Sequence, residues 1–342
     1  MYKYKEKDDV EKKQCHIIEL DKTDKRILFE LDRNSRIPDT KLAKLVRKSK
    51  ESVRYRIKQL EEKGIINGYT IWIDPARLGY SSAKIYLNLA NIPEKKKEFI
   101  EYVKNDKRLF WLGIAEGAWN AGLTFFVKTN REFFELKNEL FSKFKDLILE
   151  SHTAVPVNVN FCQKTFLHNA EAKWQSVFEK QENYVLDDIE KKIISELFRN
   201  SRISIVDIAR KYKTSHKTTV DIVRSRIKRL EEKKIIVKYT INLNFVALGY
   251  EFYKTFLYFK NLTKKDEYRL MEYTRAQHNT IHLVKQISPW DIELEIMCNN
   301  YQEYNSIIDR LTKEFVDIIN KVETAIMSED YIFPAKKMVF EG

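Results

Sequence analysis

Several signals that identify common protein classes are absent from this chain of 342 residues. No window approaches the roughly 18 uninterrupted apolar residues that span a bilayer, and residues 1–13 lack the apolar core of a signal peptide. Only three cysteines occur, Cys15, Cys162 and Cys298, with no Cys-x-x-Cys pair and no histidine cluster nearby. We therefore expect a cytoplasmic protein that binds no membrane, holds no metal and buries its cysteines as small hydrophobic residues.

Motifs of the common enzyme classes are missing as well. No glycine-rich phosphate loop and no nucleophile elbow occurs in the sequence, so we expect no catalytic residues and no cofactor. Positive charge is in excess, because 62 Lys and Arg residues stand against 50 Asp and Glu and give a net charge of +12. A chain this basic tends to bind a polyanion, either nucleic acid or an anionic membrane surface.

The excess charge is concentrated in two separated segments. Residues 20–73 contain 14 Lys or Arg against 8 Asp or Glu, and residues 186–243 contain 15 against 8. Since the rest of the chain is close to neutral, the polyanion is expected to bind these two segments.

The two basic segments are copies of each other. LDKTDKRILFELDRNSRI (20–37) aligns with LDDIEKKIISELFRNSRI (186–203) at an offset of 166 residues. RIKQLEEKGIINGYTI (56–71) aligns with RIKRLEEKKIIVKYTI (226–241) at an offset of 170. The difference of four residues is about one helical turn, so a segment of the second copy is extended without much loss of helical phase.

Each copy is expected to form three helices and a short hairpin. The apolar spacing in the first copy predicts helices over 22–33, 39–46 and 50–63, and alternation over 65–73 predicts a strand pair. Two helices joined by a tight turn form a helix-turn-helix, whose second helix can enter the DNA major groove. The candidate DNA-binding residues are Lys50, Ser52, Arg54, Tyr55 and Lys58 in the first copy and Lys217, Thr218, Thr219, Arg224, Ser225 and Lys228 in the second.

The alternative interpretation of these helices is a charged face that is merely solvated. The duplication favours DNA binding, because both copies keep the Arg-Ile-Lys spacing and a positive net charge, and phosphate contacts add up. The two faces also differ, and the second offers Asp221, which can accept from a cytosine amine or repel a phosphate. We expect one chain to read a non-palindromic site; a second copy that binds only phosphates is the alternative.

A βαββαβ order of patterns follows each copy, in residues 81–163 and 252–338. Such a unit covers one sheet face with two helices and leaves the sheet edges free to pair. We expect the two units to pair within one chain, and exchange between chains is the rival arrangement. The connector, residues 166–183, lacks Gly and Pro and spaces Ala170, Trp174 and Phe178 four residues apart, which predicts a helix.

This ordered set of motifs, present twice, resembles the leucine-responsive regulator/AsnC family of transcriptional regulators. The resemblance rests on the aligned segments above, on Leu-Gly-Tyr at 78–80 and 248–250, and on EGAWNAGLTFFV (116–127) and SPWDIELEI (288–296), and it covers residues 18–335. It implies an α+β fold in which two winged helix-turn-helix domains alternate with two ferredoxin-like βαββαβ sensing domains that self-associate. The implied order is a tail (1–17), winged helix-turn-helix 1 (18–80), sensing domain 1 (81–165), a helical connector (166–184), winged helix-turn-helix 2 (185–250), sensing domain 2 (251–335) and a tail (336–342).

The resemblance also implies a small-molecule effector, such as an amino acid, at a loop of the sensing domain that carries a glycine and an aspartate. The first copy has lost the acid and the second has lost the glycine. Packed aromatic residues are the alternative role for the two tryptophans. The implied effector-binding residues are Gly117, Trp119, Asn120, Trp290 and Asp291.

Siroheme decarboxylases share the same two-domain architecture and provide an alternative function. His278 and His282, in TRAQHNTIHL, resemble the histidines of those enzymes. The hairpin segments lack the arginine-rich stretch of the decarboxylases, and their aromatic motif is missing after His282. A decarboxylase also has no need for basic helix-turn-helix units, so a DNA-binding regulator is the favoured interpretation.

Overall fold

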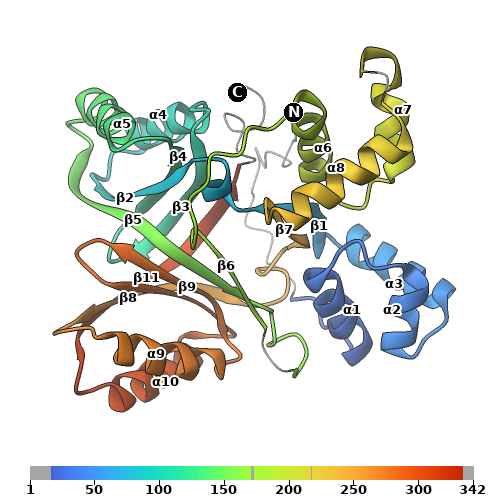
Figure 1. The fold of residues 1–342 in the computed structure, drawn as a ribbon. Helices are drawn as coiled ribbons and strands as arrows, with labels where there is room; N and C mark the ends of the chain where they lie inside the picture. Colours follow the sequence, from blue (N-terminus) through green and yellow to red (C-terminus); the bar gives the residue numbers. More distant parts are fainter. Residues whose placement is uncertain (1–16, 171–172, 217, 334–342) are drawn as a thin grey trace.

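The computed structural model describes residues 17–170, 173–216 and 218–333. Two helical units lie together on one side of the molecule, and two βαββαβ units lie together on the other (Figure 1). The mixed α+β class and the duplicated winged helix-turn-helix units predicted from the sequence are confirmed.

The first helical unit forms at the predicted positions. Asp21 caps α1 by accepting from the amide of Asp24 (2.8 Å), and Ser49 caps α3 by accepting from the amide of Ser52 (3.1 Å). These caps satisfy amide groups that would otherwise lack a partner. The unit consists of α1 (Lys22–Arg33), α2 (Asp39–Val46), α3 (Lys50–Glu62) and β1 (Ile66–Ile73).

The second helical unit repeats the first with one longer helix. Its middle helix has 12 residues where α2 has 8, so the four extra residues extend this helix by one turn, as the change in offset predicted. The unit consists of α6 (Asp188–Arg199), α7 (Ile205–His216), α8 (Val220–Glu232) and β7 (Ile236–Leu243).

The predicted hairpin in each helical unit is wrong. Each copy contributes a single strand, and β1 pairs antiparallel with β7. Asn67-Gly68 lies where the register shifts, between Ile66 and Gly68, so it forms a bulge at the start of the strand instead of a turn. Each strand therefore finds its partner in the other copy.

The βαββαβ order predicted for the second part of each copy is confirmed. In the first half, α4 and α5 cover one face of the strands, and α9 and α10 do so in the second half (Figure 1). A short 3-10 helix, η1 (Pro75–Arg77), leads into the first half. The first half is β2 (Ser81–Leu89), α4 (Pro93–Lys104), β3 (Leu109–Gly117), β4 (Ala121–Val127), α5 (Asn130–Lys143) and β5 (Ile148–Cys162); the second half is β8 (Glu251–Phe259), α9 (Lys264–Arg275), β9 (Thr280–Ile287), β10 (Ile292–Cys298), α10 (Tyr301–Glu314) and β11 (Ile319–Ile332).

The two halves join into one continuous sheet that closes on itself. The order is β2-β4-β3-β11-β8-β10-β9-β5, and β5 pairs back with β2. The long strands β5 and β11 each serve both halves: β5 pairs with β2 and then with β9, and β11 pairs with β8 and then with β3. The predicted pairing of the halves within one chain is confirmed.

The predicted helical connector is also wrong. Residues 174–177 form β6 (Trp174–Val177), which pairs with the last residues of β5. The three apolar residues taken as one helical stripe separate, because Ala170 packs on the first helical unit, Trp174 on the second half and Phe178 on the second helical unit. The last residues of β5 pair with β9 on one edge but lie beyond the pairing with β2, and β6 covers that other edge.

The pairing predicts that a disulfide between the halves forms inside one chain. Asn158 of β5 lies opposite Lys285 of β9. In a Cys15→Ser background, the pair Asn158→Cys and Lys285→Cys should oxidise to a species that runs at the monomer mass on a non-reducing gel. Covalent dimers as the main product would instead show that the halves exchange between chains.

Candidate nucleic-acid interface

The two helical units meet through their repeated Asn-Ser-Arg-Ile blocks. The hydroxyl groups of Ser35 and Ser201 are 2.6 Å apart, and both residues are fully buried. The Ser35 amide donates to the carbonyl of Tyr239, and the Ser201 amide donates to the carbonyl of Tyr69, both at 3.1 Å. The block is identical in the two copies, and this identity was the available signal in the sequence that it meets itself.

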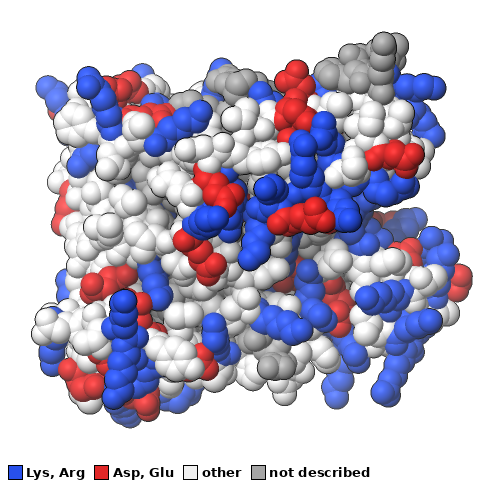
Figure 2. Space-filling model, viewed as in Figure 1, with Lys and Arg blue, Asp and Glu red and all other residues white. Residues whose placement is uncertain are grey.

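The pairing leaves the basic faces of α3 and α8 open to solvent. The side chains of Arg54 and Lys58 are 61% and 71% exposed, and those of Arg224 and Lys228 are 60% and 75% exposed. Lys and Arg side chains gather over α8 and over the neighbouring α2 and α3 (Figure 2). This face has the charge and accessibility that phosphate contact requires.

The exposed arginines are held by ion pairs of different kinds. Arg54 reaches from α3 to Asp39 of α2 (2.7 Å), and Asp39 also binds Arg202 of the other unit (2.8 Å). Arg224 binds Asp221, one turn earlier on its own helix. Because exposed ion pairs contribute only about 0 to 1 kcal/mol, both arginines can exchange these partners for a base or a phosphate.

The structure uses some predicted DNA-binding residues for other contacts. Thr218 is buried, which is a correction, since its hydroxyl is not accessible to DNA. The Thr219 side chain accepts from the amide of Ile222 and caps α8, as Ser49 caps α3. Ser225 donates to the carbonyl of Ile222 (3.0 Å). Tyr55 is exposed, whereas Lys217 lies outside the described residues.

The predicted effector residues lie inside the closed sheet or bond to its backbone. Trp119 and Trp290 are both 2% exposed. The centroids of their indole rings lie 5.1 and 5.2 Å from the centroid of the Tyr86 ring. Asn120 bonds both backbone groups of Leu89, and Asp291 accepts from the amide of Phe259. A Cβ at Gly117, where φ is +120°, would lie 2.4 Å from the Thr324 carbonyl oxygen.

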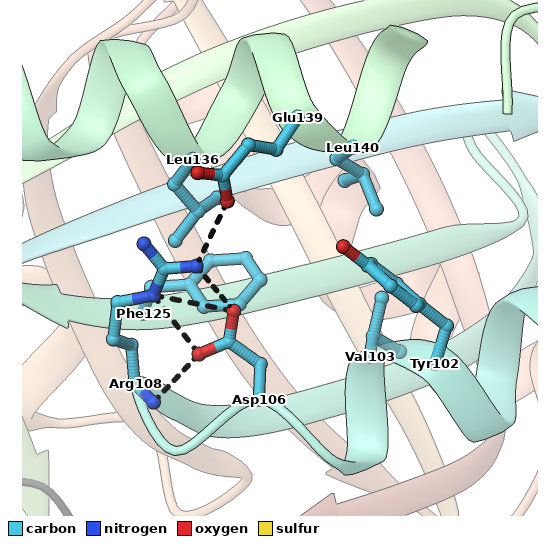
Figure 3. A pocket seen from close by; sticks show the side chains of 8 residues that line it. All are labelled: Tyr102, Val103, Asp106, Arg108, Phe125, Leu136, Glu139 and Leu140. Carbon is cyan, nitrogen blue, oxygen red and sulfur yellow. Dashed lines mark hydrogen bonds and ion pairs between the residues drawn. The ribbon is translucent and has the colours of Figure 1, made fainter. Parts of the chain in front are cut away.

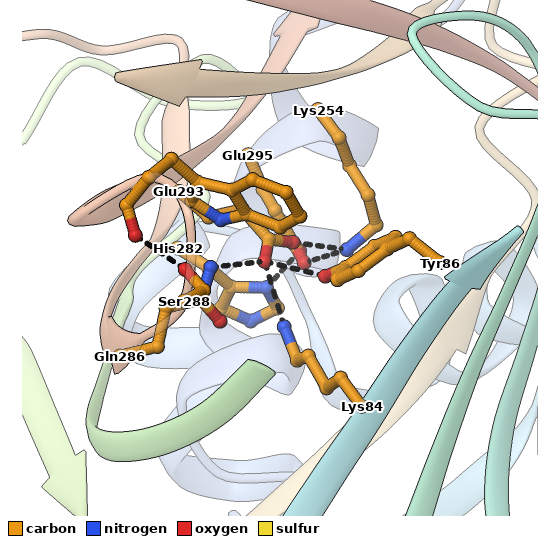
Figure 4. A network of polar contacts seen from close by, with 9 residues as sticks. Lys84, Tyr86, Lys254, His282, Gln286, Ser288, Glu293 and Glu295 are labelled. Atoms are coloured by element: carbon orange, nitrogen blue, oxygen red, sulfur yellow. Dashed lines mark hydrogen bonds and ion pairs between the residues drawn. The ribbon is translucent and has the colours of Figure 1, made fainter. Parts of the chain in front are cut away.

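A buried network of charged side chains crosses the interior between the two halves (Figure 4). Lys84 of the first half and Lys254 of the second both bind Glu293 at 2.8 Å. Lys254 also binds Glu295, which in turn contacts His282. The Tyr86 hydroxyl donates to Glu293 at 2.6 Å. None of these contacts was predicted from the sequence, since Lys84 and Glu293 are 209 residues apart.

The network keeps its carboxylates ionised. Burial would raise the pKa of Glu293, but the ammonium groups of Lys254 and Lys84 outweigh burial and hold that pKa below its usual value. Glu295 is similar: burial raises its pKa, and Lys254 and His282 lower it well below the usual value. These carboxylates hold the interior together only while they are charged.

The two halves contribute different residues to this interior. Trp111 packs where a Cβ at Gly113 or Gly122 would come within 3 Å of its ring. At 171 residues further on, the second half carries His282 in place of Trp111 and Glu293 in place of Gly122. Both network glutamates therefore come from the second half, and the first half fills the corresponding space with the Trp111 side chain.

A second buried charge links the helical units to the closed sheet. Asp32 of α1 is fully buried and binds Lys238 (2.9 Å) and Thr240 (3.0 Å) of β7 and Lys164, just after β5. Burial would raise the pKa of Asp32, but Lys164 and Lys238 together lower it far below its usual value. The equivalent of Asp32 in the second copy is Phe198, so this link exists on one side only.

The two candidate catalytic histidines lie in different surroundings. His282 faces the buried network, whereas His278 lines an open hollow of about 310 Å³ beside the second half. Another hollow, of about 10 Å³ in the first half, is closed by Arg108, which binds Asp106 (2.6 Å) and Glu139 (3.4 Å) (Figure 3). The structure therefore does not bring the two histidines into one site.

Cys162 and Cys298 are buried and unpaired, as predicted, and burial raises the pKa of both thiols. Cys15 lies outside the described residues. In residues 17–170, 173–216 and 218–333, no helix is long and apolar enough to cross a membrane. The same residues contain no group of three or more His, Cys, Asp or Glu placed to hold a metal ion.

Comparison with known proteins matches both helical units and the whole architecture. Residues 20–67 match a winged helix-turn-helix DNA-binding family, and residues 186–231 match the AsnC-type helix-turn-helix domain. The transcriptional regulator LrpA of Pyrococcus abyssi is 46% identical over 91 residues, 25% of this chain and 64% of LrpA. An uncharacterized HTH-type transcriptional regulator of Pyrococcus furiosus is 31% identical over 116 residues, 34% of this chain and 78% of that protein.

One solved structure covers nearly the whole fold. The crystal structure of the siroheme decarboxylase NirDL matches 93% of this chain and 96% of its own, with a TM-score of 0.63 and 13% sequence identity. At this identity the likeness concerns the fold. The sequence matches are shorter: the chain spans less than two thirds of LrpA and 39% of the proline dehydrogenase transcriptional activator of Rhodobacter capsulatus.

The buried network predicts a large cost for removing one carboxylate. Glu293→Gln leaves the buried Lys84 with a neutral partner, whereas Lys254 keeps Glu295, and breaking a buried pair typically costs about 3 to 5 kcal/mol. Urea unfolding should show this loss. Glu62→Gln, which removes the exposed partner of Lys58, is the control and should change the free energy of unfolding by less than about 1 kcal/mol. Equal effects would mean that the network does not stabilise the interior.

The lowered carboxylate pKa values also predict a pH dependence. Unfolded glutamate titrates near pH 4.3, so below that pH the unfolded chain binds more protons than the folded one at Glu293 and Glu295. Their contribution to stability is complete above that window and is lost as the pH falls through the folded pKa values. The difference in urea midpoint between the native chain and Glu293→Gln should therefore be constant from pH 7 to about 5 and shrink below about 4. A constant difference down to pH 3 would contradict this assignment.

Proposed function

The chain belongs to the leucine-responsive regulator/AsnC family of helix-turn-helix proteins, and from this premise we propose that it is a sequence-specific DNA-binding regulator of transcription. One observation carries the proposal: two helix-turn-helix units are fixed against each other through Ser35 and Ser201 with the basic faces of α3 and α8 exposed. A paired arrangement of this kind suits two half-sites on one duplex.

The two helices differ enough to read different half-sites. Arg54 and Arg224 are the candidates for guanine contact, because a guanidinium can donate to O6 and N7 together. Beside them, α3 presents Tyr55 where α8 presents Ser225, and Glu51 where α8 presents Asp221. The one-sided anchoring of Arg54 to Asp39 adds to this difference. We propose that one chain reads an asymmetric site.

An effector and an enzymatic activity are further proposals with their own tests. An effector at the loops of Asn120 and Asp291 would have to compete with the backbone groups that these residues now bind. Titration with amino acids, followed by tryptophan fluorescence, tests that site through Trp119 and Trp290. The fold likeness to a siroheme decarboxylase makes an assay with a porphyrin substrate the test of the alternative function.

Arginine removal should relax the specificity of one half-site at a time. After selection of a preferred duplex from random sequences, Arg54→Ala should lower discrimination in one half and Arg224→Ala in the other, each by on the order of 1 to 3 kcal/mol. Fluorescence anisotropy with single-base variants of the duplex measures both effects. Arg131→Ala is the matched control, because Arg131 is 88% exposed on α5, away from the helical units. A perfect inverted repeat as the selected site would refute the asymmetric reading.

Binding should also weaken steeply with salt. Each neutralised phosphate contributes a slope of about −0.9 to log affinity against log salt, and the two helices present Lys58 and Lys228 as well as their arginines. Lys58→Ala or Lys228→Ala should reduce the slope by about 1 while sequence preference is kept. An affinity that hardly changes between low and physiological salt would remove the basis of the DNA proposal.

A further inference from the structure

The open hollow beside the second half has a polar and acidic lining. It measures about 310 Å³ and lies between the segment after β5, the end of the second helical unit, the turn before β9 and the start of α10. This volume is at the lower end of the range for small-molecule sites. The lining residues on which the argument depends are Phe166, Tyr250, His278, Asn279, Asn299 and Glu303.

The first half shows what occupies the equivalent place there. Tyr80 is the counterpart of Tyr250, Glu132 of Glu303 and Lys128 of Asn299. The ammonium group of Lys128 lies 5.2 Å from the centroid of the Tyr80 ring, within the range of a cation–π contact. The backbone amide of Lys128 donates to the Glu132 carboxylate at 2.7 Å, so the lysine that covers the Tyr80 ring is anchored at its backbone by that carboxylate.

The second half keeps the aromatic ring and the carboxylate but has lost the lysine. The Asn299 amide donates to Glu303 at 2.8 Å, as the Lys128 amide does to Glu132, so the backbone geometry is the same. Asn299 is too short to reach over the Tyr250 ring with a charge. Among the described residues, no Lys or Arg lies over that ring and none forms an ion pair with Glu303 within 4.0 Å.

Glu303 remains ionised in this setting. Burial would raise its pKa, but the amide and side chain of Asn299, the side chain of Asn279 and the charge of Arg310 outweigh burial and lower it. Burial raises the pKa of Tyr250, and the nearby charge of Glu303 raises it further. The hollow thus presents a negative charge and an electron-rich ring to its interior.

We propose that this hollow binds a small organic cation through a primary ammonium group, which takes the place that Lys128 fills in the first half. The Tyr250 ring and the Glu303 carboxylate recognise the charge, and the amides of Asn279 and Asn299 with the His278 ring accept or donate hydrogen bonds to the rest of the ligand. The same lining disfavours an anion, because Glu303 would repel it.

The hollow also borders the first helical unit. Phe166 packs on the Tyr250 ring with the centroids 4.7 Å apart and joins the core of that unit, and the next residue, Leu167, is buried in the same core. The Thr165 hydroxyl, in the same segment, donates to the carbonyl of His278. The site is therefore built partly from the segment after β5 that packs against the core of the first helical unit. Binding at this site does not depend on the proposed function.

Calorimetric titration of the full chain with putrescine, without DNA, tests the site. 1,4-Butanediol serves as the uncharged ligand of the same length and succinate as the anion. We expect saturable binding of putrescine at one site per chain, and at least tenfold weaker binding of the other two compounds. Glu303→Gln, which keeps the shape of the side chain, should weaken putrescine binding by tenfold or more.

The first half supplies the decisive variant. Asn299→Lys places a tethered ammonium group in the hollow as Lys128 is placed in the first half, so it should abolish putrescine binding without loss of thermal stability. Gln302→Lys adds the same charge at an exposed position outside the lining and should bind as the native chain does. Absence of binding by the native chain at millimolar putrescine, equal binding of 1,4-butanediol, or unchanged binding by Asn299→Lys would each overturn the proposal.

Discussion

Strands β5 and β11 are each shared between the two halves, and the arrangement of the whole molecule depends on this sharing. Because each strand is hydrogen-bonded first to its own half and then to the other, neither half can rotate or separate without breaking a sheet. The helical units are attached to β2 and β8, so closing the sheet also brings β1 and β7 together. Asp32 then links α1 to Lys238 of β7 and to Lys164, which lies just after β5. The exposed basic helices α3 and α8 are therefore held within one connected structure.

Local features were predictable from the sequence, and features that depend on the other copy were not. Helix α1 and helix α2 form at the predicted residues, since their apolar spacing and, for α1, the Asp21 cap are encoded within a dozen residues. The strand over residues 66–73 was recognisable, but its partner is 170 residues away, so the alternation alone suggested a hairpin. The connector failed for the same reason: the residues of its apolar stripe bind three different cores.

The candidate sites divide in the same way. Arg54, Lys58, Arg224 and Lys228 are exposed on helix faces whose periodicity the sequence displays directly. Thr218 was assigned to the same surface but is buried, in the short link between α7 and α8. The contacts of Lys84 with Glu293 lay beyond sequence reasoning, since buried charges look identical to solvated ones until the partner strand is known.

The unequal interior of the closed sheet has a consequence for how the halves can pair. In a dimer of two first halves, Lys84 would face a second Lys84 without a glutamate. In a dimer of two second halves, four carboxylates would be buried with only two lysines, those at the position of Lys254. The interior face of each half is therefore complementary to the other half and not to a second copy of itself. Because Glu293 and Glu295 stand on one side and Trp111 on the other, neither half carries a set of interior charges that would balance in a symmetric dimer with a copy of itself.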